Sequence, residues 1–180
     1  MHYEELPIRG AWLITPAPAH DERGLFARLW DAAEFEARGL GPAPVQLNTG
    51  WSPRRGTLRG LHWQAAEAPE AKLVRVVRGA AFDVIVDLRP GSPTFRRWQG
   101  VELTAENRHA VWVPPLCAHG YLTLADDTEL QYAATAPYTA SAARGARWDD
   151  PALGIAWPAE VRVISERDRT WPLLDAEVTA

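Results

Sequence analysis

The sequence predicts an all-β protein of the sandwich or barrel type. Short segments rich in β-branched and aromatic residues recur about every ten residues, and turn-forming Gly, Pro, Asn and Asp residues separate them. Helical periodicity is clear in one place only, at residues 30–38. Since the chain has 180 residues, of which 47% are apolar, we expect one domain spanning residues 1–180 with a core of its own.

The predicted elements follow one another with a turn signal after most of them. The helix at 30–38 ends before Gly39, a residue that suits the C-terminal cap of a helix. Residues 54–64 lead into a strand. Further strands are predicted, in chain order, at 72–77, 81–88, 97–103, 110–113, 120–124 and 129–134.

The C-terminal part carries weaker patterns. Residues 154–162 read as an extended segment and 164–169 as a short turn, while the last six residues carry no pattern. Strands at such regular spacing, with one short helix beside them, predict a jelly roll of the cupin type with short flanking helices.

Composition excludes several classes of function. The formal net charge is −4, with 19 basic and 23 acidic residues, which argues against a protein that binds nucleic acid by neutralising phosphates. Cys117 is the single cysteine, so an internal disulfide and a Cys-rich zinc site are excluded. The N-terminus lacks the apolar run of a signal peptide, and no stretch reaches the ~18 apolar residues of a membrane span. We therefore expect a cytoplasmic protein that binds neither nucleic acid nor membrane.

The residues most able to carry chemistry lie in 54–64, RRGTLRGLHWQ. This segment places Arg59 and His62 on one strand, and Lys72 begins the next one. A histidine, a lysine and an arginine that converge in the mouth of a barrel could bind an anion and move a proton. The alternative is that His62 is a hydrogen-bonded core histidine and the arginines are solvent-exposed, and composition alone favours this alternative.

A metal site is the weaker interpretation of the histidines. His119 follows a proline turn in PPLCAHG, the place of a second-motif histidine in metal-binding cupins. Those proteins also need two histidines one residue apart, and no H-x-H occurs in this chain. Because catalytic zinc and iron generally have three protein ligands, we predict no metal site.

Seven segments, in their order and number, resemble those of one known family. They are DERGLF (21–26), TLRGLHWQ (57–64), KLVRVVRGAAFDVIVDLRPGSPTF (72–95), VELTAEN (101–107), AHGYL (118–122), RWDDPALGIAWP (147–158) and ISERD (164–168). From residue 21 to about 174 the chain resembles the dTDP-4-dehydrorhamnose 3,5-epimerases, nucleotide-sugar epimerases of the cupin superfamily. The resemblance implies epimerisation at C3, C5 or both of a nucleotide-activated 4-keto-6-deoxy sugar, with conversion of dTDP-4-keto-6-deoxyglucose to dTDP-4-keto-L-rhamnose as the leading reaction.

The resemblance also implies a catalytic set. His62 would be the base, and Asp168 of SERD would fix its tautomer and stabilise the imidazolium that forms. Lys72 of KLV would stabilise the negative charge that develops on the ketone oxygen. Tyr138 of APYTA would return a proton from the face opposite the base.

Substrate contacts carry over from the same resemblance. A phenylalanine face suits a nucleobase, and arginine forks suit a pyrophosphate. Family members exchange N-terminal residues across a dimer, so a homodimer is implied. The residues assigned to substrate binding are Arg23, Phe26, Arg28, Gln46, Asn48, Arg59, Asp83 and His119.

Several positions depart from the family pattern, and the segment LNTGWS at Asn48 lacks the serine common two places on. Arg28 stands where well-studied members have an acid that contacts thymine, Ala133 where many have lysine, Pro137 where many have tyrosine, and Ala143 where an acid is frequent. These changes leave the four catalytic positions intact. They therefore concern the exact sugar and nucleotide rather than the type of reaction.

Several alternatives stay open. The chain could epimerise one carbon only, or act on another nucleotide sugar. A 3,4-ketoisomerase of the same fold also moves protons beside a ketone, but Tyr138 and Asp168 favour the epimerase. A catalytically silent sugar-binding cupin is disfavoured by the intact base and lysine, and a metal-dependent dioxygenase by the lack of ligands.

Overall fold

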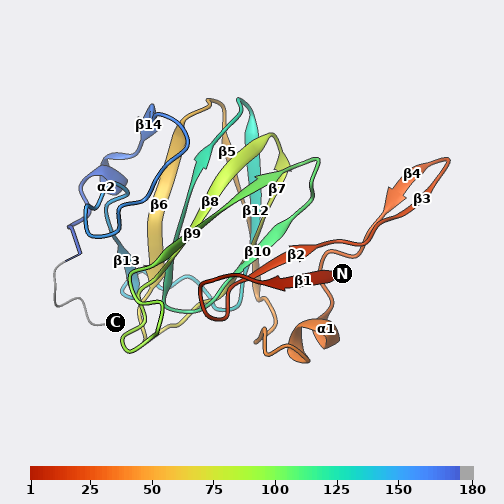
Figure 1. The fold of residues 1–180 in the computed structure, drawn as a ribbon, viewed down its shortest axis with the longest axis horizontal. Coiled ribbons are helices and arrows are strands. Elements are labelled where there is room, and N and C mark those ends of the chain that lie inside the picture. The colour runs from red at the N-terminus through yellow and green to blue at the C-terminus, as the bar shows by residue number, and fades with distance from the viewer. Residues whose placement is uncertain (175–180) are drawn as a thin grey trace.

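Two β-sheets face each other and form the body of the protein, and a β-hairpin extends from it (Figure 1). The structure is a computed structural model that describes residues 1–174, so the six patternless C-terminal residues lie outside the described part. Within residues 1–174, no helix is long and apolar enough to cross a membrane.

The first sheet has six antiparallel strands in the order β1-β2-β10-β7-β12-β5. Their bounds, in that order, are His2–Glu5, Trp12–Thr15, Ala110–Val113, Lys72–Arg78, Thr128–Ala134 and Gln46–Ser52. The predicted strands at 72–77, 110–113 and 129–134 are confirmed here, and they form the centre of the sheet.

The second sheet has the order β13-β6-β11-β8-β9, with β14 paired in parallel to β6. The bounds of these strands are Ala143–Gly145, Thr57–Gln64, Cys117–Thr123, Ala80–Asp87, Trp98–Thr104 and, for β14, Val163–Ile164. The hairpin consists of β3 (Ala19–Asp21) and β4 (Gly24–Phe26). The fold is thus the predicted cupin-type jelly roll.

The main hydrophobic core lies between the two sheets. Alternate side chains of each strand point inward, as the two-residue period of a strand requires. Val74 and Val76 from the first sheet meet Ile85 and Leu103 from the second, and all four are completely buried. This core occupies one end of the space between the sheets.

Two further clusters cover the outer faces. On the second sheet, Trp157 and Leu153 of the C-terminal segment pack against buried side chains of β6 and β8. On the first sheet, Phe35 of helix α1 (Ala32–Glu36) packs edge-on against Trp112, with 5.7 Å between ring centroids. The first cluster thus anchors the C-terminal segment to the second sheet, and the other anchors helix α1 to the first sheet.

The structure corrects two predictions about local structure. The predicted helix at 30–38 is shorter in the structure. Its N-terminal cap is Asp31, whose side chain accepts the backbone N–H of Glu34, and the chain turns away at Gly39, which has a positive φ of 69°. The segment 154–162, predicted as extended, contains no helix or strand. Residues 164–169 are more than a turn, since they contain the end of β14 and helix α2 (Glu166–Arg169).

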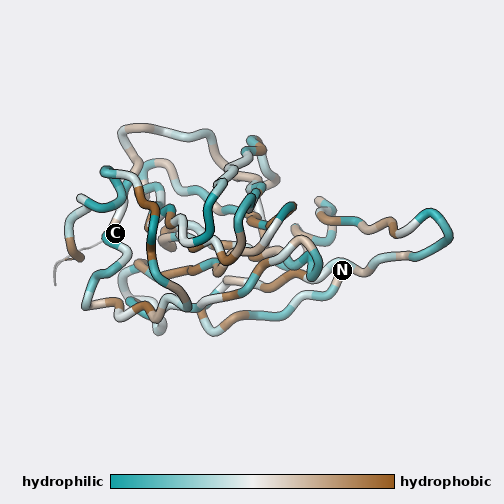
Figure 2. Tube along the Cα trace, turned by 90° about the horizontal axis from the view of Figure 1, so that it is seen from above, coloured by the Kyte–Doolittle hydropathy of each residue, from teal (hydrophilic) through white to brown (hydrophobic). Residues whose placement is uncertain are grey.

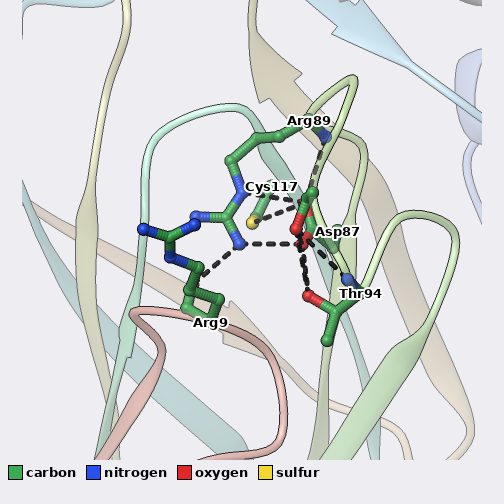
Figure 3. A network of polar contacts seen from close by, with 6 residues as sticks. Arg9, Asp87, Arg89, Thr94 and Cys117 are labelled. Atoms are coloured by element: carbon green, nitrogen blue, oxygen red, sulfur yellow. Dashed lines mark hydrogen bonds and ion pairs between the residues drawn. The ribbon is translucent and has the colours of Figure 1, made fainter.

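A buried carboxylate closes the predicted turn after β8 (Figure 3). Asp87 accepts two hydrogen bonds of 2.8 Å from the Arg89 guanidinium, and the hydroxyls of Ser92 and Thr94 also donate to it. Burial by itself would raise the pKa of Asp87, but these donors together hold it well below its usual value. Arg89 also donates to the backbone carbonyl of Arg9, which ties the turn to the N-terminal loop.

Candidate active site

A cavity of about 860 Å³ lies between the two sheets. Strands β5, β7 and β12 line it from the first sheet, and β6 and β11 line it from the second, with α2 at one side. Polar side chains take the inward positions of these strands. Eight of the twelve residues predicted from the sequence line this cavity: Gln46, Asn48, Arg59, His62, Lys72, His119, Tyr138 and Asp168.

His62 and Asp168 form a short polar contact in the cavity. The Nε2 atom of His62 lies 2.6 Å from Oδ1 of Asp168, although the two residues are 106 positions apart in the chain. The Asp168 side chain is 6% exposed and that of His62 is 42% exposed, so the carboxylate is fixed in the wall while the ring reaches the cavity. Because Nε2 is engaged, Nδ1 is the nitrogen left for a substrate.

The protein keeps Asp168 ionised. Burial alone would raise the pKa of this carboxyl, but hydrogen bonds from His62 and from the backbone N–H of Gly60 outweigh that effect and lower the pKa. An ionised Asp168 can orient the imidazole and stabilise its protonated form.

Two local features place this pair. Ser165 caps α2 by accepting the backbone N–H of Asp168, which aims the carboxylate at β6. Strand β6 bulges towards it, because the register with β11 shifts by one residue between His62 and Arg59. Gly60 makes the bulge possible: its φ is +135°, and a Cβ on it would lie 2.5 Å from the Cα of Gly120.

Trp171 is a neighbour of the pair that sequence reasoning missed. Its ring lies edge-on to His62, with centroids 6.5 Å apart, and the guanidinium of Arg167 lies 5.0 Å above it. Gly145 on β13 is in contact with the indole and leaves no room for a Cβ. The indole therefore packs against the outer side of the imidazole and restricts its orientation.

His119 has a carboxylate partner of its own. Its Nε2 lies 2.8 Å from Oδ2 of Asp83, whose side chain is fully buried. His119 itself lines the cavity, whereas Asp83 lies behind it. Of the two roles expected for Asp83, orienting another group or contacting the substrate, its contact with His119 fits the first.

Lys72 also pairs with a carboxylate, and this one lines the cavity. The Nζ atom lies 3.2 Å from Oε2 of Glu70, and the two side chains are 14% and 7% exposed. Tyr132 is nearby on β12. Burial first, and then the charge of Glu70, raise the pKa of Tyr132. Sequence reasoning had singled out neither Glu70 nor Tyr132.

Tyr138 lies at the rim, in the loop after β12, and is 60% exposed. Two glutamines hold its backbone. Gln46 accepts the N–H of Tyr138 at 3.0 Å, and Gln64 accepts the N–H of Thr139 at 2.6 Å while donating to the carbonyl of Pro137. Gln46, predicted as a substrate contact, therefore also positions this loop.

Three predicted residues do not reach the cavity of their own chain. Arg23 at the tip of the β3–β4 hairpin pairs with Asp21, and Arg28 lies 3.3 Å from Asp31. Phe26 is 77% exposed. The hairpin projects from the body in both views (Figures 1 and 2), and its tip is hydrophilic.

Metal binding has no cluster of ligands here. Within residues 1–174, no group of three or more His, Cys, Asp or Glu side chains is arranged to hold a metal ion. The pairs at His62 and His119 each contain one histidine and one carboxylate.

Comparisons with known proteins give consistent matches. The family model described as dTDP-4-dehydrorhamnose 3,5-epimerase matches residues 5–176. A protein of that name from Sinorhizobium fredii is 44% identical over 97% of this chain and 90% of its own length. The crystal structure of the Bacillus anthracis enzyme of that name, with TDP and PPi bound, superposes with a TM-score of 0.92 at 38% identity, covering 96% of this chain and 99% of that chain.

A further solved structure is a variant of ChmJ, a 3'-monoepimerase from Streptomyces bikiniensis, in complex with dTDP. It superposes with a TM-score of 0.88 at 36% identity, covering 96% of this chain and 86% of that chain. In that variant a histidine is replaced by asparagine and, 70 positions later, a tyrosine by phenylalanine.

Proposed function

Because the chain belongs to the dTDP-4-dehydrorhamnose 3,5-epimerase family, we propose that it inverts C3, C5 or both of dTDP-4-keto-6-deoxyglucose. The observation that carries this proposal is the His62–Asp168 pair, which faces the cavity across from Lys72. The enzyme is an isomerase, and for its reaction we predict neither metal nor cofactor.

The residues support a proton-transfer mechanism without change of oxidation state. His62 removes the proton from the carbon beside the ketone; the electron pair of that C–H bond forms the C=C bond of the enolate, and the π pair of the C=O bond moves to the ketone oxygen. The ammonium of Lys72 stabilises the resulting enolate, an effect of roughly 3 or 4 kcal/mol for one well-placed donor. A donor on the opposite face then protonates the same carbon, which inverts it.

Two tyrosines are candidates for that donor. Tyr138 is the one predicted from the sequence, and it lies at the rim of the cavity. Tyr132 is half-buried on β12 of the first sheet, whereas His62 is on β6 of the second, so the cavity separates the two. In spacing, Tyr132 follows His62 by 70 positions, as the replaced tyrosine follows the replaced histidine in the ChmJ variant. We therefore favour Tyr132 and test both.

The nucleotide is proposed to bind where the cavity meets its rim. Arg59 and Asn48 line the cavity of this chain and are the candidates for contact with the nucleotide. Arg23 and Phe26 of the hairpin, and Arg28 just after it, are proposed to act on the cavity of a second subunit, because all three are exposed and none lines the cavity of its own chain.

A homodimer is part of the same proposal. The outer face of the first sheet carries exposed apolar side chains, with Val45 61% and Leu47 73% exposed. Beside them is an apolar hollow of about 200 Å³, lined by Leu29 and Trp30 among others. Large exposed apolar surfaces mark interaction sites, and here a second copy of the chain would cover them.

The function is tested with dTDP-4-keto-6-deoxyglucose in deuterated water, followed by NMR. We expect deuterium to enter at the epimerised carbons. Exchange at C3 and C5 supports the double epimerase, and exchange at one carbon supports a single-carbon enzyme such as the 3'-monoepimerase ChmJ. A keto group that moves from C4 to C3 would instead identify a 3,4-ketoisomerase.

His62→Ala is the control for this experiment. It should remove exchange and epimerisation together while the variant stays folded by circular dichroism. Retention of a tenth or more of the wild-type rate would contradict the role of His62 as the base.

A further inference from the structure

Glu70 is a carboxylate in the cavity that has no role in the mechanism described above. It lies in the segment between β6 and β7, lines the cavity, and has a side chain that is only 7% exposed. The buried carboxylates Asp83 and Asp168 each pair with a histidine, and Asp168 also accepts the backbone N–H of Gly60. Within residues 1–174, the ammonium of Lys72 is the one polar partner of the Glu70 carboxylate, at 3.2 Å.

We propose that Glu70 is a positioning residue for this reaction, which holds the ammonium of Lys72 so that it meets the ketone oxygen in one orientation. The proposal deepens the proposed function and rests on it. Lysine has a long flexible side chain and three N–H donors, so one donor can bind Glu70 while the others remain for the substrate.

Positioning explains the pair better than charge does. A carboxylate beside Lys72 offsets part of the positive charge that stabilises an enolate, so a carboxylate placed only for charge would slow the reaction. A fixed donor, however, requires little reorganisation when negative charge develops on the oxygen. Catalysis falls steeply when a catalytic group is misplaced by as little as about 1 Å.

The negative charge of Glu70 has a second consequence, for Tyr132. Burial and then Glu70 raise the pKa of this phenol, and Arg59 opposes them. Tyr121 also interacts electrostatically with Tyr132. The other charged or titratable groups that line the cavity are His62, Lys72, His119, Tyr138, Arg144, Arg167 and Asp168. Removal of the Glu70 charge should therefore lower the pKa of Tyr132, and activity that needs the protonated phenol should be lost at a lower pH.

The test compares Glu70→Gln with the wild type, using dTDP-4-keto-6-deoxyglucose as substrate. We expect kcat to fall about tenfold or more, KM to change by less than about threefold, and the alkaline limb of the kcat profile to move to lower pH. Glu67→Gln is the matched control: Glu67 lies in the same segment and pairs with Arg144 at 3.0 Å, but its side chain is 55% exposed. The control should retain wild-type kinetics.

A double-mutant cycle with Lys72→Met separates positioning from a general effect on the fold. If Glu70 acts through Lys72, Glu70→Gln has no further effect on kcat once Lys72 is replaced. Equal losses in both backgrounds, or wild-type kcat and pH profile in Glu70→Gln, would overturn the proposal. A wild-type enzyme that epimerises no 4-keto nucleotide sugar would instead overturn the proposed function.

Discussion

At the scale of single residues, Asp168 makes the sharpest prediction. Its carboxylate has a lowered pKa and is ionised at neutral pH, where it stabilises protonated His62. Asp168→Asn should keep the fold but lower kcat about 10³-fold or more, because a neutral amide cannot stabilise the imidazolium. Steady-state kinetics with a circular dichroism spectrum check this, and a loss below tenfold would contradict it.

The two tyrosines give a second prediction. Phenylalanine at the true donor position still allows His62 and Lys72 to form the enolate, which then lacks a proton source on the opposite face. The donor variant should therefore lose epimerised product much more than deuterium wash-in. We expect this separation in Tyr132→Phe.

Tyr138→Phe is the matched comparison, since it also removes a tyrosine hydroxyl from the lining of the cavity. We expect product and wash-in to change together in this variant. The reverse result, with the separation in Tyr138→Phe, would restore the donor predicted from the sequence.

The sequence predicts His62 from a dense motif and Lys72 from its place at the start of the next strand, but it pairs His62 with Asp168 only through the resemblance to a family. The reason is physical: 106 positions separate the two, and no local spacing indicates contact. Glu70 and Trp171 were missed for a related reason. Each lies in a segment without periodicity, and its importance comes from a neighbour that only the fold brings near.

At the scale of elements, the central strands were predictable and the cavity-lining edge strand was not. Strands β7, β8 and β10 carry apolar residues in a clear pattern because they are buried. Strand β5 alternates Gln46 and Asn48 towards the cavity with Leu47 towards the exposed outer face. Strand β5 therefore has polar residues on its inner face and an apolar residue on its outer face, which is the reverse of the usual alternation of a strand that covers a hydrophobic core. Helix α2 has four residues, too few for periodicity.

The bulge in β6 gives a prediction about Gly60. An added Cβ would meet the Cα of Gly120 at 2.5 Å and would also be strained at a φ of +135°. Gly60→Ala should lower the free energy of unfolding by about 3 kcal/mol or more and disturb the hydrogen bond to Asp168. Urea denaturation checks the stability.

Gly91→Ala separates the effect of backbone strain at a positive φ from the effect of the close approach of the strands. Gly91 also has a positive φ, +73°, but a Cβ on it would meet nothing within 4 Å. Gly91→Ala should lower the free energy of unfolding by about 1–2 kcal/mol and leave activity unchanged. Equal losses in the two variants would show that close approach of the strands is not what requires glycine at position 60.

The turn after β8 predicts how stability depends on pH. Asp87 has a pKa held below its ordinary value, so the stability it contributes is fully present above about pH 4 and is lost as pH falls further. Arg89→Ala leaves this buried carboxylate without its main partner and should cost about 3–5 kcal/mol at pH 7. In urea denaturation, the difference from the wild type should shrink at pH 3.

Arg147→Ala is the matched control for Arg89→Ala. Arg147 and Asp149 also pair through two hydrogen bonds at the same sequence spacing, but this pair is on the surface. Arg147→Ala should lower the free energy of unfolding by less than about 1 kcal/mol. Similar losses for the two arginines would contradict the importance of burial at Asp87.

At the scale of the whole molecule, the two sheets divide the chemistry between them. The second sheet carries the base on β6, and the first carries Lys72 on β7 and Tyr132 on β12. A substrate between the sheets would thus meet groups on both faces, which inversion of a carbon requires. The hairpin lies outside this arrangement. Its place is explained if it completes the site of a second subunit.

Mixing two inactive variants tests that arrangement. Arg23→Ala removes the hairpin contribution and His62→Ala removes the base, so neither homodimer should be active. In a heterodimer, one site combines the intact hairpin of one subunit with the intact base of the other. Random mixing makes half of the dimers heterodimers with one intact site in two, so refolding equal amounts together should recover up to about a quarter of wild-type activity.

The matched control is a mixture of His62→Ala with Lys72→Met. Both residues line the cavity of the same chain, so no heterodimer contains an intact site and no activity should return. Sedimentation velocity should show dimers in both mixtures, and ion-exchange chromatography of a charge-tagged variant should show that subunits have mixed. Absence of recovery in the first mixture, with mixing demonstrated, would mean that Arg23 serves its own subunit or no site. An active wild-type monomer at micromolar concentration would remove the dimer proposal altogether.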